Sequence, residues 1–275
     1  MLGAIIGDIV GSTREHHNVK TEDFELLPVG SRFTDDTVMT LAVAEWLMLD
    51  PEHTENGLID CMQHWGRKYY NAGYGGRFKK WLIAHNPRPY NSWGNGSAMR
   101  VSPIGLYAKS LDEALRLAAI SASVSHNHPE GIKGAQAVAA CVYFKKNLAS
   151  GTDEEMVAFV SDEIGYNLDI DLEKMRAQYA FDVTCQGSVP IAIRAYLDRS
   201  GCSAEQALRL AISMGGDSDT IGAITASIAD AERYHSYGAG LDGPLVASCR
   251  TLLPADLLTI NDDFEKLISA LHNNK

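Results

Sequence analysis

Residues 37–49, TVMTLAVAEWLML, decide the fold class. Their apolar side chains recur at the spacing of an α-helix, and further apolar residues fill the remaining side of that helix. The helical set is Val38, Leu41, Ala42 and Trp46, and the additional residues are Val43 and Leu47. A helix that is apolar nearly all round is buried, because none of its sides suits contact with water. The segment therefore predicts a helical bundle with residues 37–49 at its centre.

Six other segments show a helical period, and each opens on residues that commonly cap or start helices. They are SLDEALRLAAISASV (110–124), GIKGAQAVAACVYFKKNL (131–148), EEMVAFVSDEIGY (154–166), PIAIRAYLDRS (190–200), SAEQALRLAI (203–212) and DDFEKLISALHNN (262–274). Alternating strand patterns are scarce, and AIIGDIVGS (4–12) is too short to indicate a sheet. Without repeats or linker-like runs, we predict one domain over residues 1–275. The expected fold class is all-α: a single compact orthogonal bundle of about ten or more helices.

Composition argues against several classes of protein. The 275 residues carry a formal net charge of −11, whereas a nucleic-acid-binding surface needs clustered Lys and Arg. The apolar stretches fall short of the ~20 residues of a membrane helix, and the N-terminus lacks the basic region of a signal peptide. Five widely spaced cysteines without a C-x-x-C pair indicate free thiols in a reducing compartment. We therefore predict a cytoplasmic protein that binds neither membranes nor nucleic acid strongly.

Two short polar clusters stand directly before apolar helical segments. The first is Thr34, Asp35, Asp36 and Thr37, in SRFTDDTVMT. A helix cap explains one such residue, because one side-chain oxygen satisfies the free backbone amides. Two adjacent aspartates exceed that need, and crowding their like charges beside an apolar helix is costly. From this cluster alone, a cap and a metal site remain equally open.

The second cluster repeats the composition of the first, in GGDSDT before IGAITASIA. It supplies Asp217, Asp219 and Thr220, and Gly215 and Gly216 permit a close backbone approach. Ligand sets made only of oxygen suit Mg²⁺ or Mn²⁺, and four aspartates with threonine hydroxyls suffice for two ions. Zinc fits poorly, because neither cluster has Cys or His at zinc-ligand spacing. The two clusters together predict a dinuclear Mg²⁺ or Mn²⁺ site in a cleft.

Five stretches, in chain order, resemble the successive motifs of the ADP-ribosylglycohydrolase family. They are GDIVGSTRE (7–15), RFTDDTVMT (32–40), GNGSAMRVSPIG (94–105), SHNHPEG (125–131) and GGDSDTIGAI (215–224). The resemblance covers nearly the whole chain. It implies an all-helical, single-domain hydrolase that removes ADP-ribose from an acceptor, with two Mg²⁺ or Mn²⁺ ions at the bottom of a cleft.

The resemblance also implies roles for individual residues. The metal ligands are Thr34, Asp35, Asp36, Asp217, Asp219 and Thr220. The substrate-binding residues are Gly94, Asn95, Gly96 and Ser97, which cradle the diphosphate of ADP-ribose, together with His126 and a supporting Asp8. Glu15 lies on a mobile loop beside the metals. Ala226 and Asp230 depart from the family pattern, and we interpret them as packing variation.

Each of these residues also has an ordinary structural interpretation. GNGSAMR suits a common loop-to-helix turn, and His126 suits a surface loop. Asp8 is compatible with a helix cap through Ser12 or a backbone amide, and Glu15 with a solvated charged loop. Three aromatic residues near the motifs are left out of the predicted site, because aromatic side chains near a cleft more often belong to the core. They are Tyr74, Phe78 and Trp93.

The leading function is hydrolysis of the glycosidic bond between ADP-ribose and an acceptor, with Asp35, Asp36 and Glu15 as catalytic residues. We expect Asp35 or Asp36 to orient the attacking water and Glu15 to act as acid, base or lid. A non-catalytic member of the same fold and a metal-dependent phosphoesterase are the alternatives, the latter with only Arg32 and Arg100 as cationic clamps. The partner is an ADP-ribosylated substrate whose acceptor the sequence does not specify. The oligomeric state is open, and a monomer is compatible with the sequence.

Overall fold

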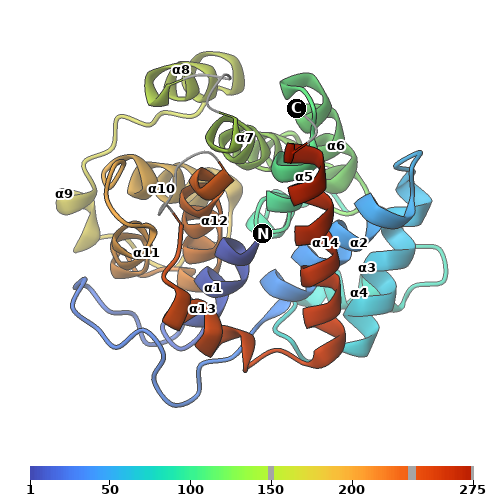
Figure 1. Ribbon diagram of the computed structural model, residues 1–275, viewed down its shortest axis with the longest axis horizontal. Helices are drawn as coiled ribbons and strands as arrows, with labels where there is room; N and C mark the ends of the chain where they lie inside the picture. Colours follow the sequence, from blue (N-terminus) through green and yellow to red (C-terminus); the bar gives the residue numbers. More distant parts are fainter. Residues whose placement is uncertain (148–151, 235–239, 274–275) are drawn as a thin grey trace.

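Helix α2 (Asp35–Leu49) is buried along most of its length and contacts helices from both ends of the chain. In this computed structural model, which describes residues 1–147, 152–234 and 240–273, α2 packs against α1, α3, α5, α12 and α14. Figure 1 shows α14 crossing in front of α2, with α3 and α4 beside it. The prediction of a central helix at residues 37–49 is therefore confirmed, with two aspartates added at its start.

The all-α prediction is confirmed, since no strand occurs within the described ranges beyond one isolated bridge between Gly94 and Thr184. The α-helices are α1 (Leu2–Gly11), α2, α3 (Glu55–Lys68), α4 (Gly76–Ile83), α5 (Ser102–Tyr107), α6 (Leu111–Ser123), α7 (Pro129–Lys146), α8 (Asp153–Ala158), α9 (Leu172–Arg176), α10 (Cys185–Leu197), α11 (Ala204–Ser213), α12 (Ser218–Ala231), α13 (Gly243–Arg250) and α14 (Ala255–Asn273). Helical turns of other types are η1 (Asn95–Ser97), η3 (Phe159–Ile164) and η4 (Glu232–Tyr234). Residues 4–11 of the segment 4–12, for which the sequence predicted no element, belong to α1, and Ser12 is its C-cap.

Several helix boundaries follow from their capping residues. Ser110 and Ser203 cap α6 and α11 at the positions where the sequence opens those segments. Helix α10 begins at Cys185, earlier than the predicted start at Pro190, because Thr184 caps it and Pro190 is accommodated inside the helix. The segment 154–166 changes from α8 to the π-helical turn η3 instead of continuing as one helix. The predicted ends at Leu148 and Asn274 lie outside the described residues.

Helices α1 and α12 pack closely in antiparallel orientation, through glycines four residues apart on α1. A Cβ on Gly3 would lie 2.2 Å from the carbonyl oxygen of Ala226, and one on Gly7 would lie 2.2 Å from that of Gly222. A Cβ on Gly11 would lie 2.4 Å from Cα of Asp219. The helices can approach this closely only because these glycines lack side chains. This packing brings the C-terminal end of α1 against the N-terminal end of α12.

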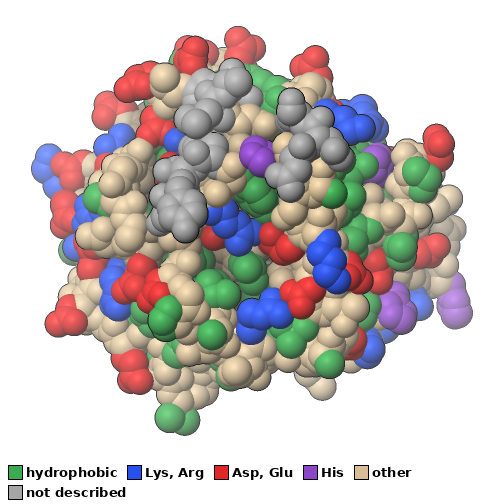
Figure 2. Space-filling view, in the orientation of Figure 1, with side chains coloured by type: hydrophobic (Ala, Val, Ile, Leu, Met, Phe, Trp, Pro, Cys, Tyr) green, Lys and Arg blue, Asp and Glu red, His purple; other side chains and the backbone are tan. Residues whose placement is uncertain are grey.

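The N-terminus of α1 is held by Asp230, near the other end of α12. The backbone amide of Gly3 donates to Oδ2 of Asp230 at 3.1 Å, and Arg233 forms an ion pair with the same oxygen at 3.5 Å. Asp230 therefore stabilises the α1–α12 pair, which refines its interpretation as packing variation. On the face drawn in Figure 2, acidic and basic side chains are interspersed. No helix in the described ranges has the length and apolar character needed to span a membrane.

Candidate active site

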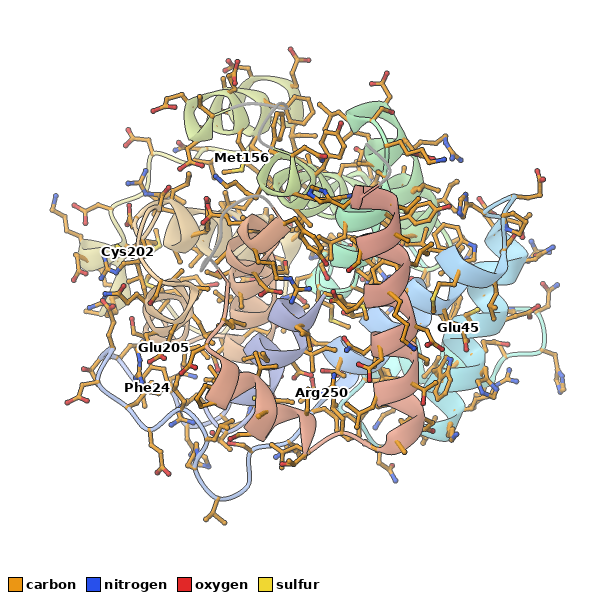
Figure 3. The ribbon with its side chains drawn as sticks, in the orientation of Figure 1. Phe24, Glu45, Met156, Cys202, Glu205 and Arg250 are labelled. Carbon is orange, nitrogen blue, oxygen red and sulfur yellow. The ribbon has the colours of Figure 1, made fainter. Side chains whose placement is uncertain are left out.

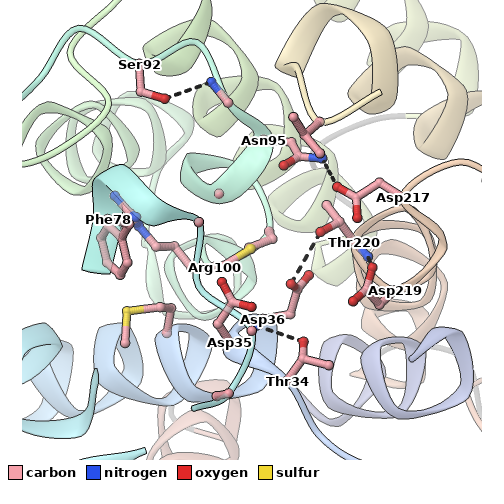
Figure 4. A pocket seen from close by; sticks show the side chains of 18 of the residues that line it. Thr34, Asp35, Asp36, Phe78, Ser92, Asn95, Arg100, Asp217, Asp219 and Thr220 are labelled. Atoms are coloured by element: carbon pink, nitrogen blue, oxygen red, sulfur yellow. Dashed lines mark hydrogen bonds between the residues drawn. The ribbon is translucent and has the colours of Figure 1, made fainter. Parts of the chain in front are cut away.

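A cavity of about 470 Å³ opens where α2 and α12 begin, a volume within the range of small-molecule sites. Its wall includes both Thr/Asp clusters, Glu15, the loop Gly94–Gly96 and His126. Figure 4 shows the two clusters facing each other, with Asn95 above Asp217. The fold thus brings residues 34–36 beside residues 217–220, although about 180 residues of sequence separate them.

Asp8 lies beneath the cavity and fixes the start of α2. Its fully buried carboxylate accepts hydrogen bonds from the backbone amides of Thr34 and Thr37 at 2.8 and 3.1 Å, and from both of their hydroxyls. Burial raises the pKa of Asp8 to about 6, although these hydrogen bonds oppose the increase. Asp8 does not line the cavity, so its predicted substrate contact is replaced by a positioning role. It caps α2 across helices, and not its own helix through Ser12.

We expect Asp8→Ala to weaken both the fold and the site. Loss of the carboxylate leaves buried amides and hydroxyls unpaired at the start of α2, which should cost about 2 kcal/mol or more of unfolding free energy. Asp50→Ala is the matched control. Asp50 follows the C-terminal end of α2, outside the cavity wall, and its carboxylate accepts hydrogen bonds from the amide and hydroxyl of Thr54. Denaturant unfolding should show both variants destabilised, whereas divalent-cation affinity should fall only for Asp8→Ala. Equal cation affinity in the two variants would contradict the positioning role.

Asp36 is the most deeply enclosed carboxylate in the cavity wall. Its Oδ2 accepts a hydrogen bond from the hydroxyl of Thr220 at 3.3 Å, which joins the two clusters directly. Its Oδ1 is buried and has no hydrogen-bond partner among the described residues. Burial and the charges of Asp8 and Asp35 raise the pKa of Asp36 well above its usual range. An unpaired carboxylate oxygen in such surroundings is costly unless a cation binds it.

The pKa values of the neighbouring carboxylates are raised for the same reasons. Burial, followed by the charge of Asp8, raises the pKa of Asp35 to about 8. Burial and the charges of Asp217 and Asp36 raise the pKa of Asp219 well above its usual range. Glu15, Asp217 and Asp219 each place a carboxylate oxygen within 4.8 Å of the other two. The residues present therefore fit an oxygen-coordinated divalent cation, which would offset the repulsion.

Asp217 is oriented by a residue of the glycine loop. Its Oδ2 accepts a hydrogen bond at 2.6 Å from the amide nitrogen Nδ2 of Asn95, which also donates to Ser188 at 3.1 Å. The backbone amide of Asn95 donates to the carbonyl of Val183 at 2.8 Å. Asn95 therefore connects the glycine loop to the second acidic cluster, a contact that the sequence did not reveal.

Glu15 reaches the second cluster because its segment is attached to the turn before α12. The backbone amide of Gly216 donates to Oδ1 of Asn18 at 2.9 Å, and Nδ2 of Asn18 donates to the carbonyl of Gly216 at 3.2 Å. Gly215 and Gly216 have φ angles of 71° and 73°, and a Cβ on Gly215 would lie 2.8 Å from Oδ1 of Asn18. The predicted close approach at these glycines is thus made by the chain's own segment. Burial and the charge of Asp217 raise the pKa of Glu15.

The remainder of this segment is anchored to α11. The guanidinium groups of Arg14 and Arg209 lie 4.8 and 5.2 Å from the ring centre of Phe24. Arg209 also donates to the backbone carbonyl of Phe24 at 2.8 Å and forms an ion pair with Glu205 at 2.7 Å. Figure 3 shows Phe24 close to Glu205. These contacts hold the segment that carries Glu15 against the bundle.

The glycine loop forms the part of the cavity wall between Asp217 and His126. Gly94, Asn95 and Gly96 line the cavity, but Ser97 is fully buried behind them. The Ser97 hydroxyl donates to the carbonyl of Gly131 at 2.7 Å and lies 3.2 Å from that of Gly94, so Ser97 shapes the loop and does not face a ligand with its side chain. The loop leads into the turn η1, and the next helix, α5, begins only at Ser102. The N-terminus of α5 therefore does not directly follow the loop.

His126 lies in the cavity wall with 6% of its surface exposed, which differs from a surface loop residue. Of the three aromatic residues left out by the sequence analysis, Phe78 lines the cavity and Tyr74 and Trp93 do not. Two aromatic wall residues, Tyr90 and Phe181, were missed, because each lies in an irregular segment without a distinctive motif. Arg100 also lines the cavity and is 1% exposed.

Fold and site define a class: an all-α protein with a cluster of carboxylates, suited to binding a divalent cation, at one end of a small-molecule cavity. The chain belongs to the ADP-ribosylglycohydrolase family, whose sequence model matches residues 1–233, and the predicted family resemblance is thereby confirmed.

Relatives of this chain come from distant organisms. An uncharacterized protein of Archaeoglobus fulgidus is 28% identical over 88% of this chain and 89% of its own length. The mouse protein named ADP-ribosylhydrolase ARH3 is 27% identical over 84% of this chain and 82% of its own length, and its human counterpart is 26% identical. A solved structure described as an ADP-ribosylglycohydrolase-related protein complex has a TM-score of 0.70 at 24% identity, covering 99% of this chain and 96% of that one. This last likeness supports the shared fold alone.

Proposed function

We propose that this protein hydrolyses the glycosidic bond between ADP-ribose and an acceptor, with divalent cations held by the acidic cluster. The observation that carries the proposal is the two-ended cavity. Five carboxylates meet at one end, around an unpaired oxygen of Asp36. His126 and Arg100 lie at the other end, and the glycine loop runs between the two ends, from Asp217 to His126; this end suits an anionic diphosphate. Family membership and the relatives named ADP-ribosylhydrolase support the same substrate class.

The proposed cation ligands are the six residues predicted from the sequence, with Glu15 close to them. The hydroxyl of Thr34 donates to Asp8 and that of Thr220 donates to Asp36, which joins the two clusters. Mg²⁺ or Mn²⁺ ions at these oxygens would supply charge for orienting the ribose hydroxyls and for activating water. We propose two ions, because the carboxylate and hydroxyl oxygens that converge here are more than one ion would bind.

The chain's own residues complete the proposed mechanism. Cleavage at the anomeric carbon of the ribose passes through an oxocarbenium-like state, so the sugar must be held and water must be placed on one face. Asp35 and Asp36 face the cavity from the start of α2, where either oxygen pair orients that water. Glu15 faces the same cavity from the segment that follows α1. We assign proton transfer to it, since its raised pKa helps its carboxyl group to hold and release a proton.

The acceptor is expected to contact the segment between α3 and η1. Residues 72–92 contribute more of the cavity wall outside the clusters than any other continuous segment of similar length, including Gly73, Arg77 and Tyr90. Segment 16–31 contributes no wall residue in the described structure, although Glu15 and Arg32 flank it. We therefore place acceptor specificity mainly on residues 72–92.

Calorimetric titration of ADP-ribose into the protein tests the proposal. The protein is first stripped of metal with a chelator and then reloaded with Mg²⁺ or Mn²⁺. We expect binding only after reloading, because the ribose end of the cavity carries unscreened carboxylates without a cation. Asp60→Asn, an exposed substitution on α3, serves as a control that should bind like the unmodified protein.

A second assay separates the alternatives. Incubation of the metal-loaded protein with ADP-ribosylated substrates should release intact ADP-ribose. Binding without release would favour a non-catalytic member of the fold, and cleavage within the diphosphate would favour a phosphoesterase. Failure of ADP-ribose to bind with either metal would contradict the proposed function.

A further inference from the structure

Arg100 is a buried cation without an anionic partner. Its side chain is 1% exposed, and it lines the same cavity as the glycine loop. Its guanidinium donates to the carbonyl and hydroxyl of Ser121 and to the hydroxyl of Ser125, and it forms no ion pair with a carboxylate of the described chain. A buried charge without a counter-ion is costly in a folded protein. The position of Arg100 at the cavity therefore calls for a functional explanation.

Ser125 connects Arg100 to His126. The guanidinium donates to Oγ of Ser125 at 3.1 Å, and the same Oγ lies 2.8 Å from Nδ1 of His126. Because a guanidinium only donates, Ser125 accepts from Arg100 and its single proton is available for Nδ1. The opposite orientation would leave the buried hydroxyl proton without another acceptor among the described residues. The network thus makes Nδ1 the acceptor and places the imidazole proton on Nε2.

The Nε2 edge of His126 faces the open side of the glycine loop. A Cβ on Gly96 would lie 3.3 Å from Nε2 and one on Gly94 would lie 3.6 Å from it. Nε2 has no hydrogen-bond partner in the described part of the chain, and His126 lines the cavity. Burial, with the charges of Arg100 and Arg77, keeps the pKa of His126 well below its usual range, so the ring is neutral. A neutral ring with its proton on Nε2 is a single fixed donor.

We propose that Arg100 is a positioning residue that acts through Ser125 to fix the Nε2–H tautomer of His126, which then donates a hydrogen bond to an anionic oxygen of the ligand at the glycine loop. The identity of that ligand as ADP-ribose rests on the proposed function. The tautomer itself is a property of the ligand-free protein. The unpaired charge of Arg100 also favours an anion at this end of the cavity.

Nitrogen NMR of the imidazole rings tests the tautomer without any ligand. In the metal-loaded, ligand-free protein at pH 7, His126 should show one protonated nitrogen, Nε2, and an unprotonated Nδ1 far downfield of it. His126→Gln identifies the resonances by their disappearance. A His126 ring that is protonated on Nδ1, or on both nitrogens, would overturn the proposal whether or not ADP-ribose binds.

Two serine variants test the connection to binding. Ser125→Ala removes the hydroxyl between Arg100 and His126, and Ser121→Ala removes a hydroxyl that accepts from the same guanidinium at 3.3 Å without reaching His126. We expect Ser125→Ala to give a mixture of His126 tautomers and to weaken ADP-ribose binding about tenfold. Ser121→Ala should retain the tautomer and bind within about threefold of the unmodified protein. Equal effects of the two variants on tautomer and affinity would overturn the proposal.

The design separates this inference from the proposed function. If ADP-ribose binds no variant, including the unmodified protein, the proposed function fails and the His126 spectrum still decides the tautomer. If ADP-ribose binds and Ser125→Ala changes neither tautomer nor affinity, the positioning role fails alone. Circular dichroism of each variant establishes that the helical fold is retained before the comparison.

Discussion

Asp36→Asn is expected to abolish hydrolysis while making the metal-free protein more stable. Asparagine keeps the size of the side chain and its contact with Thr220, but it removes one charge from a buried group of carboxylates. Loss of a residue that only supports a metal ligand already costs about 10–100-fold, so loss of a ligand should exceed about 100-fold in activity. The expected gain in stability has the opposite sign, because the like charges no longer repel one another. Asp219→Asn should behave in the same way.

Thermal unfolding measured with and without metal checks this expectation. Metal-free Asp36→Asn should melt about 2–4 °C higher for each kcal/mol of repulsion that is removed. Added Mg²⁺ or Mn²⁺ should raise the melting temperature of the unmodified protein and leave that of the variant unchanged. Asp60→Asn is the control, with unchanged activity and an unchanged response to metal. Wild-type-like hydrolysis by either Asp36→Asn or Asp219→Asn would contradict the assignment of the metal ligands.

The pH dependence of stability tests independently whether the carboxylates of this site repel one another. Burial and the charge of Asp8 raise the pKa of Asp35 to about 8 in the folded protein, compared with about 3.9 in an unfolded chain. Such a group destabilises the metal-free fold increasingly as pH rises from about 4 to about 8, since the unfolded chain loses its proton first. Denaturant unfolding of Asp35→Asn and unmodified protein should therefore diverge over this range, with the variant more stable at pH 8. Coinciding curves would show that these carboxylates do not repel one another.

The sequence was sufficient to predict what depends on local pattern. An apolar helix at 37–49 has one energetically reasonable place, and a Thr/Asp/Asp group at the start of a buried helix exceeds the needs of a cap. It was insufficient where the outcome depends on which surfaces meet. Asp8 was assigned to substrate, yet its carboxylate faces the amides of another helix. Ser97 shares the glycine loop with residues of the cavity wall, but its hydroxyl turns inward to Gly131.

Other parts of the site carried no readable local signal. Asn95 meets Asp217 across 122 positions of sequence, and amide side chains are too common to predict such a pair. Tyr90 and Phe181 reach the cavity from irregular segments, where hydrophobic periodicity does not apply. One overlooked signal was present: glycine at positions 3, 7 and 11 lies on one face of a helix and marks a close helix contact. A side chain added on that face should therefore disturb the packing of α1 on α12.

Gly11→Ala is expected to destabilise the protein strongly and to disrupt the site in the molecules that still fold. The new Cβ would lie 2.4 Å from Cα and 2.6 Å from N of Asp219, and both are backbone atoms that cannot rotate away. Helix α12 must move, and overpacking of this kind typically costs about 1–3 kcal/mol. For a chain of this size, that corresponds to a loss of several degrees in melting temperature. The displaced residue is a proposed metal ligand, so cation affinity should fall as well.

Gly3→Ala separates the two consequences of this helix contact. Its Cβ would lie 2.2 Å from the carbonyl oxygen of Ala226, at the end of the α1–α12 pair far from the cavity. We expect comparable thermal destabilisation but a smaller loss of cation affinity, measured by titration well below the melting temperature. Gly243→Ala, whose new Cβ would meet no atom within 4 Å beyond its chain neighbours and the backbone of its own helix, is the control for the substitution itself. If Gly11→Ala and Gly3→Ala lost cation affinity equally, the glycine face would act only through global stability. If Gly11→Ala lost more, the close packing of α1 on α12 would be what holds the second acidic cluster in register with the first.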